Sequence, residues 1–586
     1  MEKHWKIKET PDKRLVEEFA SATHVSPILS SLLLQRGINT PTLAQDFFSP
    51  DISKLHDPML FCDMAKAVSR VKKALANGER ILIYGDYDVD GTTAVALVHT
   101  ALERFCAEPN SQLGYYIPDR YTEGYGISQK GVEYAHSGGY SLVIALDCGI
   151  KAVERMKYAR SLGIDFIICD HHTPGEVIPD VVACLNSKRV DCNYPDKNLS
   201  GCGVGFKLMQ ALYRSKGIAD EELMPLLDLV VVSIASDIVP IIGENRILAH
   251  NGLRQLNTTP RIGLRSIIHT AGLTEGNIGM GDIVFKLGPR INAAGRMRSG
   301  NEAVRILLER DANIADELSR QINDSNDERK DLDRIVTSQA IDRIESQDPQ
   351  HTASSTVLYD PEWSKGVIGI VASRLTETYY RPTIILTRSQ ANPDYATGSA
   401  RSIDGFDLYK AIDACSDLLE NFGGHTYAAG LTMKIENVDK FATAFEKYAS
   451  QNLTAEQRCQ QIDIDAEIKL ADVKPALLAE LQSLEPFGSA NTKPVFMTRG
   501  IYDYSTSKQF GQHQQHLKLD LIDATDCTIR SGVGFCLGHL HEVLSSGSKV
   551  DICYTIEENE FRGKKQLQLM VKDLRLSEVD SPEDEY

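Results

Sequence analysis

The chain has 586 residues, of which 42% are hydrophobic and 25% charged, and its formal net charge is −18. This length predicts roughly three or four domains, and the composition is that of a soluble protein able to bury several cores. The N-terminal stretch "MEKHWKIKET" carries charges where a secretory signal needs an apolar core, so we expect no secretion.

The negative charge argues only weakly against a nucleic-acid partner. Phosphate binding needs basic surface, but a metal site needs carboxylates, and the acidic tail 576–586, predicted to be disordered, adds further negative charge. The 12 cysteines form no C-x-x-C pair, which argues against structural zinc and favours reduced thiols in a cytoplasmic protein. The longest apolar stretch, 223–242, contains Asp228 and Asp237, so we expect a buried element and no contact with a membrane.

Residues 1–45 are predicted to form a helical N-terminal segment, and residues 46–245 a first α/β domain. In that domain, helical patterns alternate with short apolar runs rich in β-branched residues. These runs lie at 80–86, 113–119, 141–147, 165–170 and 181–186. Such alternation predicts βαβ units and a parallel sheet.

Residues 246–350 are predicted to form a long helical connector. Residues 301–347 of this connector contain no Gly or Pro, and they combine helical spacing with many charges. We therefore expect a solvated, charged helix between two domains.

A second α/β domain is predicted at 351–455, beginning near "SSTVLYDPEW" and containing "RPTIILTR" and "GGHTYAAG". After residue 486, apolar and polar residues alternate between turn-like breaks. This pattern predicts an antiparallel all-β module within 456–575, most simply a small OB-like barrel. The expected fold class is thus α/β, with a parallel-sheet domain, a helical connector, a second α/β domain and a small all-β barrel.

The segment "IYGDYDVDG" (83–91) places Asp86, Asp88 and Asp90 on alternate positions. An EF-hand calcium loop also opens D-x-D-x-D-G, but it follows a helix and carries a bidentate Glu at its twelfth position. Here the preceding run is strand-like, and the twelfth residue is Leu97. The EF-hand is therefore excluded.

Acidic residues also follow two further strand-like runs. Asp147 ends 141–147, Asp170-His171-His172 ends "FIIC", and Asp237 lies inside the apolar stretch. Ligands of open parallel sheets bind beyond the carboxyl ends of the strands, so these side chains should converge on one crevice. Clustered carboxylates repel unless a cation or protons neutralise them, and oxygen ligands with imidazole favour Mn²⁺ or Mg²⁺ over zinc. A helix cap, a turn or a buried hydrogen-bonded acid explains each residue alone; the joint occurrence favours a metal site.

With "DHH" at 170–172, this set resembles the DHH phosphoesterase superfamily. The stretch "GGHTYAAG" (423–430) is similar to the signature of its DHHA1 companion domain. Together with "GSARS" (398–402), "LGPRINAAGRM" (287–297) and the terminal OB-like module, most of the chain resembles the RecJ family of bacterial exonucleases. We therefore expect the DHH catalytic domain at 46–245, the DHHA1 domain at 351–455 and the OB-like domain at 456–575.

The resemblance implies hydrolysis of single-stranded DNA 5′→3′ to mononucleotides, in recombination and repair, with two Mn²⁺ or Mg²⁺ ions. It implies that Asp88 binds the first ion and Asp90 the second. Asp147 would bridge both ions, and His171 and Asp237 would complete the second site. Asp86 would fill the place of a histidine that the pyrophosphatase branch carries at the position of Tyr84. The implied metal ligands are Asp86, Asp88, Asp90, Asp147, His171 and Asp237.

The implied catalytic residues are Asp147 and His172, with His172 facing the substrate phosphate as an electrostatic stabiliser or proton donor. Candidate substrate-binding residues are Arg120, Arg290, Arg296, Ser399, Arg401, Gly423, Gly424 and His425. The glycines allow backbone N–H groups close to a phosphate, and arginines can grip a 5′-terminal phosphate bidentately. A surface position or an ion pair explains each arginine alone better. A glycine-rich turn is the alternative for the glycines, and the following His425 favours phosphate binding.

The implied partners are single-stranded DNA, a single-strand-binding protein and a RecQ-type helicase, for a monomer in the cytoplasm. Aromatic residues of the OB-like module, Phe510, Phe535 and Tyr554, are either a stacking surface for bases or core residues. Two other hypotheses stay open. One is an oligonucleotide or cyclic-dinucleotide phosphodiesterase, which needs no OB-like module, and the other is a non-catalytic replication scaffold, which would lack the metal-binding acids.

Overall fold

The computed structural model describes residues 3–390, 392–561 and 564–577, and the chain forms two compact units. The larger unit contains residues 52–458 and 488–490, and the smaller one contains 1–51, 459–487 and 491–586. Most of the predicted acidic tail, from residue 578 on, lies outside the described residues.

The larger unit contains a parallel sheet of five strands in the order β3-β2-β4-β5-β6. All four strand pairings are parallel. The strands are β2 (Ile81–Gly85), β3 (Leu113–Tyr116), β4 (Leu142–Leu146), β5 (Asp165–Cys169) and β6 (Ala183–Leu185). The five predicted strands and their parallel arrangement are confirmed.

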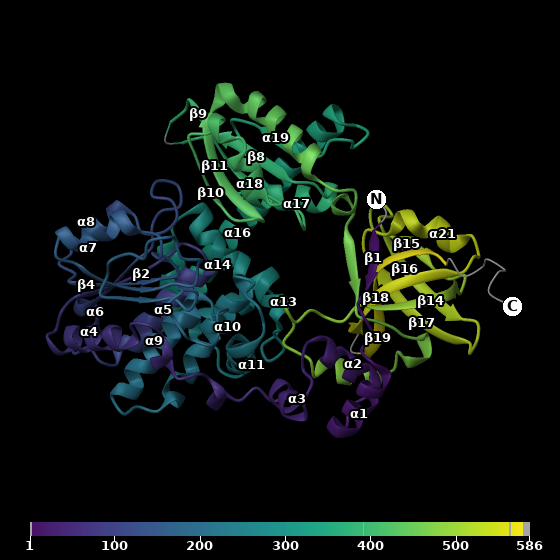
Figure 1. Cartoon of the computed structure of the whole chain (residues 1–586), viewed down its shortest axis with the longest axis horizontal. Helices are drawn as coiled ribbons and strands as arrows, with labels where there is room; N and C mark the ends of the chain where they lie inside the picture. Colours follow the sequence, from purple (N-terminus) through teal and green to yellow (C-terminus); the bar gives the residue numbers. More distant parts are fainter. Residues whose placement is uncertain (1–2, 391, 562–563, 578–586) are drawn as a thin grey trace. The chain divides into compact units, whose positions relative to one another are not determined.

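Helices cover both faces of this sheet (Figure 1). Helices α4 (Met64–Ala76), α5 (Val89–Glu103) and α9 (Gly201–Ser215) pack on one face. Helices α7 (Gln129–Ser137) and α8 (Val153–Ser161) pack on the other. Because both faces are covered, the central strands are apolar along their whole length and do not alternate.

The apolar stretch at 223–242 forms helix α10 (Leu227–Ser236), which packs against α5, α9 and α11 (Gly243–Thr258). Asp237 directly follows α10 as its C-cap residue, and its side chain is 29% exposed. The prediction that Asp237 lies within a buried run is therefore wrong: the helix ends just before it, and its side chain is only partly buried. Among the residues that the structure describes, no helix is both long and apolar enough to span a bilayer.

The predicted connector is helical but not one solvated helix. It contains α12 (Ile262–Thr270), α14 (Gly288–Met297) and α15 (Gly300–Leu308), and a separate 36-residue helix α16 (Ala312–Gln347) follows. The break comes at Asp311, whose side chain accepts hydrogen bonds from the first N–H groups of α16.

Helix α16 also buries much of one side, which corrects the prediction of a solvated helix. Leu318 and Ile322 join the core of the parallel-sheet domain, and Val336 and Ile344 join that of the second α/β domain. The helix therefore belongs to two cores at once.

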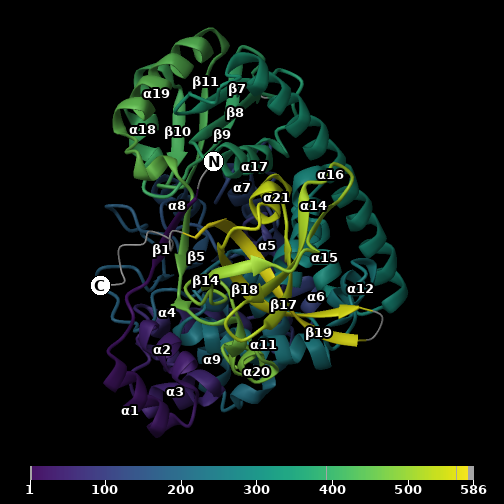
Figure 2. The same cartoon turned by 90° about the vertical axis from the view of Figure 1, so that its right-hand side faces the viewer.

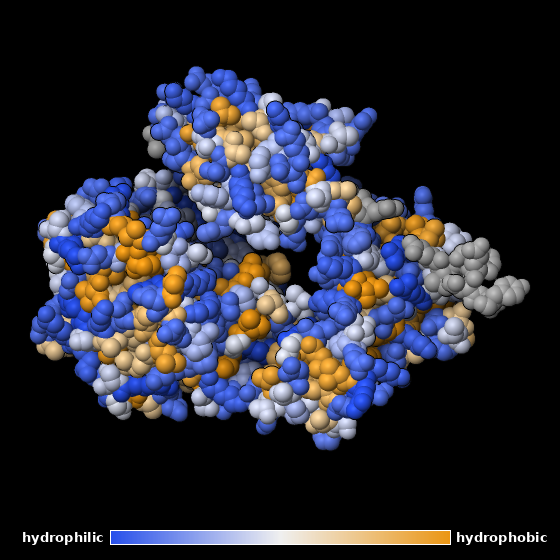
Figure 3. Space-filling view, in the orientation of Figure 1, coloured by the Kyte–Doolittle hydropathy of each residue, from blue (hydrophilic) through white to orange (hydrophobic). Residues whose placement is uncertain are grey.

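Hydrophilic residues predominate on the face of the molecule drawn in Figure 3, and hydrophobic ones form separate groups.

The second α/β domain contains a mixed sheet in the order β10-β11-β9-β8-β7. Figure 2 shows α18 (Leu408–Asp413) and α19 (Val438–Asn452) on one side of it and α17 (Ile368–Tyr379) with α16 on the other. The strands are β7 (Thr356–Tyr359), β8 (Thr383–Arg388), β9 (Tyr395–Arg401), β10 (Asn421–Gly424) and β11 (Ala428–Lys434). The predicted α/β character is confirmed.

The smaller unit contains residues from both ends of the chain. Strand β1 (His4–Ile7) pairs in parallel with β12 (Gln461–Ile464). Helices α1 (Lys13–Thr23), α2 (Pro27–Gln35) and α3 (Pro41–Phe48) follow β1. The N-terminal segment is thus helical as predicted, except that it begins with a strand.

The rest of this unit is a barrel. Strands β14, β18, β19, β17 and β16 pair in that order, and β14 also pairs with β16, which closes the ring. The seven strands of this sheet are β13 (Ala466–Glu467), β14 (Phe496–Asp503), β15 (Lys508–Phe510), β16 (His516–Asp523), β17 (Thr528–Gly534), β18 (Val550–Phe561) and β19 (Lys564–Leu576). The barrel is confirmed, but the prediction of a purely antiparallel module is wrong, because β17 and β19 pair in parallel.

Candidate active site

Three acidic residues lie at the carboxyl ends of neighbouring strands of the parallel sheet. Asp86 follows β2, Asp147 follows β4 and Asp170 follows β5, and these strands are adjacent. All three side chains are buried. The predicted convergence of strand-end carboxylates is therefore present.

The start of helix α5 supplies two further carboxylates. Asp88 is the N-cap residue and accepts a hydrogen bond from the Gly91 N–H at 3.0 Å. Asp90, in the first turn, accepts from the N–H groups of Gly201 (2.6 Å) and Cys202 (2.7 Å) and from the Ser233 hydroxyl (2.7 Å). The N-termini of α5 and α9 thus both point at the carboxylates, where helix dipoles stabilise negative charge.

Asp147 lies in a conformation that few residues adopt. Its φ is 58°, in the left-handed region, where Asp and Asn are tolerated better than most other residues. A Cβ at Gly201 would lie 2.6 Å from the Asp147 Cβ, so only glycine lets α9 begin this close to the carboxylate. Strain of this kind persists where surrounding structure enforces it, commonly at functional sites.

The buried acids are only partly satisfied by the protein. Among the described residues, Asp86 Oδ2, Asp147 Oδ1 and His171 Nε2 have no hydrogen-bond partner. His171 Nε2 lies 3.1 Å from Asp147 Oδ1, 3.5 Å from Asp237 Oδ2 and 3.8 Å from Asp90 Oδ2. One imidazole nitrogen is therefore surrounded by carboxylates of three separate elements.

Two overlapping groups could each hold a cation: Asp147 with His171 and His172, and Asp90 with His171 and Asp237. Within each group the ligand atoms lie within 4.8 Å of one another. Oxygen and imidazole donors without thiolate suit Mn²⁺ or Mg²⁺. We name Asp86, Asp88, Asp90, Asp147, Asp237 and His171 together the carboxylate cluster.

Mutual repulsion and burial perturb the cluster strongly. Burial, with Asp88 nearby, raises the pKa of Asp90 to about 6, and burial with Asp90 and Asp88 raises that of Asp237 to about 9. Burial and the neighbouring acids raise the pKa of Asp147 and of Asp86 well above the usual range. Burial and the neighbouring His172 lower the pKa of His171 to about 3, so its imidazole is neutral and able to bind a metal.

Asp170 and Tyr125 fix the orientation of His172. His172 Nδ1 lies 2.8 Å from Asp170 Oδ1, and the backbone N–H of His172 donates to the same oxygen at 3.0 Å. Although burial opposes the charged form of each, this contact lowers the pKa of Asp170 to about 2 and raises that of His172. The Tyr125 hydroxyl lies 3.1 Å from the His172 ring nitrogens and donates to the Asp147 carbonyl at 3.2 Å.

Tyr84 takes no part in the cluster. Its hydroxyl donates to the Gly126 carbonyl at 2.9 Å and accepts from the Ser128 N–H at 3.1 Å, and its ring stacks on Tyr116. Asp86 Oδ2, in contrast, is buried and unpartnered among the described residues. The role of Asp86 as the substitute ligand stays a prediction.

A second group of charged side chains gathers in the same unit. Arg296, on α14, is half-buried; burial and the charges of Arg120, Arg329 and Arg401 lower its pKa to about 9. The Arg401 guanidinium donates to the Ser399 hydroxyl at 2.9 Å. None of Arg120, Arg296 and Arg401 forms an ion pair with a carboxylate of the described chain. We name Arg120, Arg296, Arg329 and Arg401 the arginine cluster.

Clustered, partly buried guanidinium groups without carboxylates favour an anion such as a phosphate. The Arg120 guanidinium also lies 4.1 Å above the Tyr87 ring, and its charge acts on Asp86. The two clusters therefore adjoin each other around residues 86–87.

The remaining predicted substrate-binding residues lie outside the two clusters, although Arg290 and His425 interact electrostatically with neighbouring site residues. The Arg290 guanidinium donates to the Lys286 carbonyl and to Asn323 Oδ1, and its charge acts on Arg329 of the arginine cluster but is not among those that act on Arg296. Gly423 and Gly424 belong to strand β10, not to a turn, and Gly424 has a φ of 155°, at which a Cβ would lie 2.4 Å from the Ala428 carbonyl. His425 is exposed just after β10; burial, Lys151 and His172 lower its pKa.

The sequence analysis did not identify several residues that contribute to the site. Ser233 and the backbone of 201–202 hold Asp90, and Arg329 of α16 joins the arginine cluster. Two sequence features could have indicated such roles. Ser200 is a helix-capping residue directly before the glycine-rich start of α9, and Asp170, the first residue of "DHH", orients His172, the third.

On the barrel of the smaller unit, Tyr554 is fully buried and is a core residue. Phe510 and Phe535 are 36% and 55% exposed, and both rings contact His516, with centroids 5.1 and 5.2 Å away. These three rings form an exposed aromatic group.

Three family models match the chain. The DHH family N-terminal domain matches residues 80–234, the DHHA1 domain 352–451 and the RecJ OB domain 464–573.

Relatives match over nearly the whole length. The chain is 37% identical over 578 residues to the single-stranded-DNA-specific exonuclease RecJ of Bacillus subtilis, covering 98% of this chain and 71% of the relative. It is 31% identical over 563 residues to that of Dickeya dadantii, covering 93% and 96%.

Solved structures agree with this likeness. The crystal structure of RecJ in complex with Mn²⁺ from Thermus thermophilus superposes with a TM-score of 0.83 at 26% identity, over 98% of this chain and 80% of that one. A crystal structure of exonuclease RecJ bound to manganese gives 0.58 at 30% identity, over 68% and 97%.

Proposed function

The chain belongs to the RecJ family of single-stranded-DNA-specific exonucleases, and from this premise we propose that it degrades single-stranded DNA 5′→3′ to mononucleotides in a metal-dependent reaction. The observation that carries the proposal is the adjacency of two clusters that the protein leaves unneutralised. The carboxylate cluster is suited to divalent cations, and the arginine cluster to a terminal phosphate.

The donor set fits two Mn²⁺ or Mg²⁺ ions. Asp90, Asp237 and His171 would hold one ion, Asp88 and Asp86 the other, and Asp147 would lie between them. When bound, such ions supply a deprotonated water and screen the charge of the phosphoryl oxygens.

The protein's own groups position the substrate and move a proton. Because Asp170 accepts the His172 Nδ1–H and raises the pKa of the ring, the protonated imidazole would donate its second N–H to the scissile phosphate, in place of its contact with Tyr125. Arg120, Arg296 and Arg401, with Ser399, would hold the 5′-terminal phosphate. This anchoring sets the polarity of cleavage, since the nucleotide at the 5′ end is then the one presented to His172.

Further surfaces would guide the rest of the strand. The exposed group of Phe510, His516 and Phe535 can stack on successive bases, which is tolerant of sequence. His425 and the Gly423-Gly424 backbone, on the edge strand β10, can contact backbone phosphates. Arg290 would make a more distant phosphate contact.

We further propose that the chain acts as a monomer in the cytoplasm, in DNA recombination and repair, with a single-strand-binding protein and a RecQ-type helicase as partners. The alternative of an oligonucleotide or cyclic-dinucleotide phosphodiesterase is disfavoured because residues 464–573 match the RecJ OB domain. Such an activity does not need this domain. The non-catalytic scaffold is disfavoured because every candidate metal ligand is present.

The test uses the full chain with Mn²⁺ or Mg²⁺ and single strands labelled at either end, beside matched duplexes. We expect immediate release of a labelled mononucleotide from the 5′-labelled strand, gradual shortening of the 3′-labelled one and little attack on duplex. Immediate release of the 3′ label as a mononucleotide would contradict the polarity. Cleavage of a blunt duplex at the same rate would contradict the single-strand preference.

A further inference from the structure

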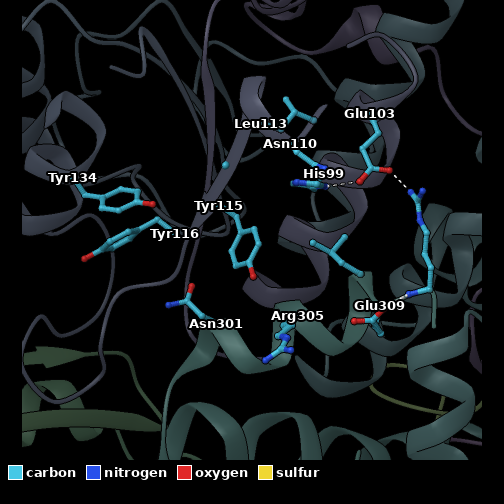
Figure 4. Close-up of a pocket in the computed structure, with 13 residues that line it drawn as sticks. His99, Glu103, Asn110, Leu113, Tyr115, Tyr116, Tyr134, Asn301, Arg305 and Glu309 are labelled. Atoms are coloured by element: carbon cyan, nitrogen blue, oxygen red, sulfur yellow. Dashed lines mark hydrogen bonds and ion pairs between the residues drawn. The ribbon is translucent and has the colours of Figure 1, made fainter. Parts of the chain in front are cut away.

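A cavity of about 760 Å³ opens beside β3, the edge strand of the parallel sheet (Figure 4). Its walls come from α5, β3, α7 and α15. None of the residues assigned above to metal or phosphate binding lines it. Its volume lies within the range of about 300–1,000 Å³ that is usual for small-molecule sites.

Two acids and two arginines line this cavity, and within the described residues both acids already have partners. Glu103 pairs with Arg310 and lies 3.2 Å from His99 Nδ1 (Figure 4), and Glu309 accepts hydrogen bonds from the two backbone N–H groups that follow it. Both lining carboxylates are therefore satisfied. Arg305, which is exposed, forms no ion pair within the described part of the chain, so its guanidinium is free to bind an anion.

Tyr115 and Asn301 lie beside this guanidinium, whereas Tyr116, on the opposite face of the sheet, and Tyr134 line the cavity further away. Tyr115 points toward Asn301 and Arg305, and the rings of Tyr116 and Tyr134 lie together, with centroids 4.9 Å apart (Figure 4). Tyr134 is 44% exposed, so part of its ring is accessible. Aromatic faces stack on nucleobases, and an amide can pair with the edge of a base.

An edge strand could instead accept an added polypeptide strand. Strand β3, however, has only four residues, and very short edge strands are a common protection against such pairing. Strand addition would also leave the Arg305 charge unused. The lining groups favour a small ligand that carries both an aromatic ring and a phosphate.

We propose that this cavity binds a nucleotide, with its phosphate on the Arg305 guanidinium and its base against the tyrosine rings of β3 and α7. The nucleotide can be a free mononucleotide or one unit of a DNA strand, since both offer the same groups. The site is separate from the proposed active site and does not depend on hydrolysis.

Binding is measured by calorimetry with 2′-deoxyadenosine 5′-monophosphate and the full chain in EDTA, so that no metal contributes. Because the arginine cluster can hold a nucleotide of its own, all variants carry Arg401→Gln. We expect one nucleotide to bind per chain, Arg305→Gln to weaken it about tenfold or more, and Tyr134→Leu to weaken it several-fold. Arg334→Gln, which removes an exposed charge of α16, is the matched control.

Equal binding by the Arg305→Gln and Arg334→Gln chains would overturn the proposal, and so would absence of binding to the Arg401→Gln chain. Equal binding of 2′-deoxyadenosine would overturn the role of the phosphate. Matching thermal unfolding midpoints of the variants exclude a folding defect. Because no step requires cleavage, failure here is distinguishable from failure of the proposed exonuclease function.

A competition measurement assigns the source of the nucleotide. If a short single strand without a 5′ phosphate displaces the mononucleotide from the Arg401→Gln chain, the ligand is a unit of DNA. If the mononucleotide stays bound, the cavity selects free nucleotides, which are the product class of the proposed reaction.

Discussion

The carboxylate cluster and the arginine cluster carry opposite charges in one unit, and the protein neutralises neither. They differ in what they do without a ligand. The carboxylates can take up protons, and the raised pKa values of Asp90 and Asp237 describe that response. The arginines stay charged at neutral pH even where burial lowers the pKa, as at Arg296. The first cluster should therefore bind its ligand in competition with protons, whereas the second should attract an anion over the whole neutral range.

The largest expected effect comes from removing one charge of the carboxylate cluster. Asp147→Asn keeps a residue that tolerates the left-handed backbone but removes the charge from the unpartnered oxygen. We expect hydrolysis of single-stranded DNA to fall on the order of 1,000-fold or more, because the charge that would lie between two cations is lost. The measurement is release of acid-soluble nucleotide in Mn²⁺.

Asp180→Asn is the control for this change, because Asp180 is an exposed acid paired with Arg160. The Asp180→Asn chain should hydrolyse single-stranded DNA at the rate of the unmodified chain. An active Asp147→Asn chain would show that the carboxylate cluster is structural.

The arginine cluster gives the next largest effect. Arg401→Gln removes a guanidinium that contacts Ser399, and we expect kcat/KM on a 5′-phosphorylated strand to fall about 10- to 100-fold, the value of a charge-assisted hydrogen bond. On a strand with a 5′ hydroxyl the loss should be much smaller. Equal losses on both strands would mean that the cluster does not read the terminal phosphate; Arg334→Gln serves as the control.

Because the carboxylate cluster takes up protons when no cation is bound, the stability of the metal-free chain should depend on pH. The pKa of Asp237 is about 9 in the folded chain, far above its usual value of 3.8. At pH values between these two, the folded state therefore binds more protons than the unfolded state. Stability of the metal-free chain therefore falls as pH rises through this window. We expect a decrease of about 2–4 °C in the unfolding midpoint between pH 6 and 8.5 in EDTA.

Magnesium should reverse this trend, because the cation replaces the protons, so the stabilisation by Mg²⁺ should grow with pH. Asp237→Asn should flatten the EDTA profile. A midpoint in EDTA that rises between pH 6 and 8.5 would contradict the assigned repulsion. Calorimetric scans at both pH values provide the measurement.

The smallest effect tests the link between the clusters. Tyr125→Phe removes a hydroxyl that contacts His172 and the Asp147 carbonyl, while keeping the ring that contacts Tyr87 edge to face. We expect kcat to fall about 2- to 10-fold with little change in KM, as for loss of one neutral hydrogen bond. Tyr158→Phe, on α8, removes a hydroxyl that contacts Glu133 and should leave both constants unchanged.

The sequence predicted those parts of the site that local geometry determines. Asp86, Asp147 and Asp170 each follow a strand, and parallel strands of one sheet end at the same edge, so their convergence follows from the pattern alone. Asp237 was found only as an acid in an apolar stretch, and its place at a helix end needed the structure.

What could not be predicted depends on contacts between distant segments. Arg329 reaches the arginine cluster only because α16 packs against both α/β domains. Strands β17 and β19 of the barrel pair in parallel, yet alternation of apolar and polar residues predicts a strand without identifying its neighbour. The break at Asp311 was readable as a helix cap, but the absence of Gly and Pro concealed it.

Strand β1 pairs with β12, more than 450 positions further along, so the barrel-containing unit consists of both ends of the chain and the larger unit is inserted into it. During synthesis the first fifty residues therefore cannot pack into their unit until residues 459–586, with which they share it, have emerged from the ribosome. The inserted part meets no such delay and can assemble first. Fusion tags or truncations at either terminus would consequently disturb one and the same module, and leave the metal-binding half intact.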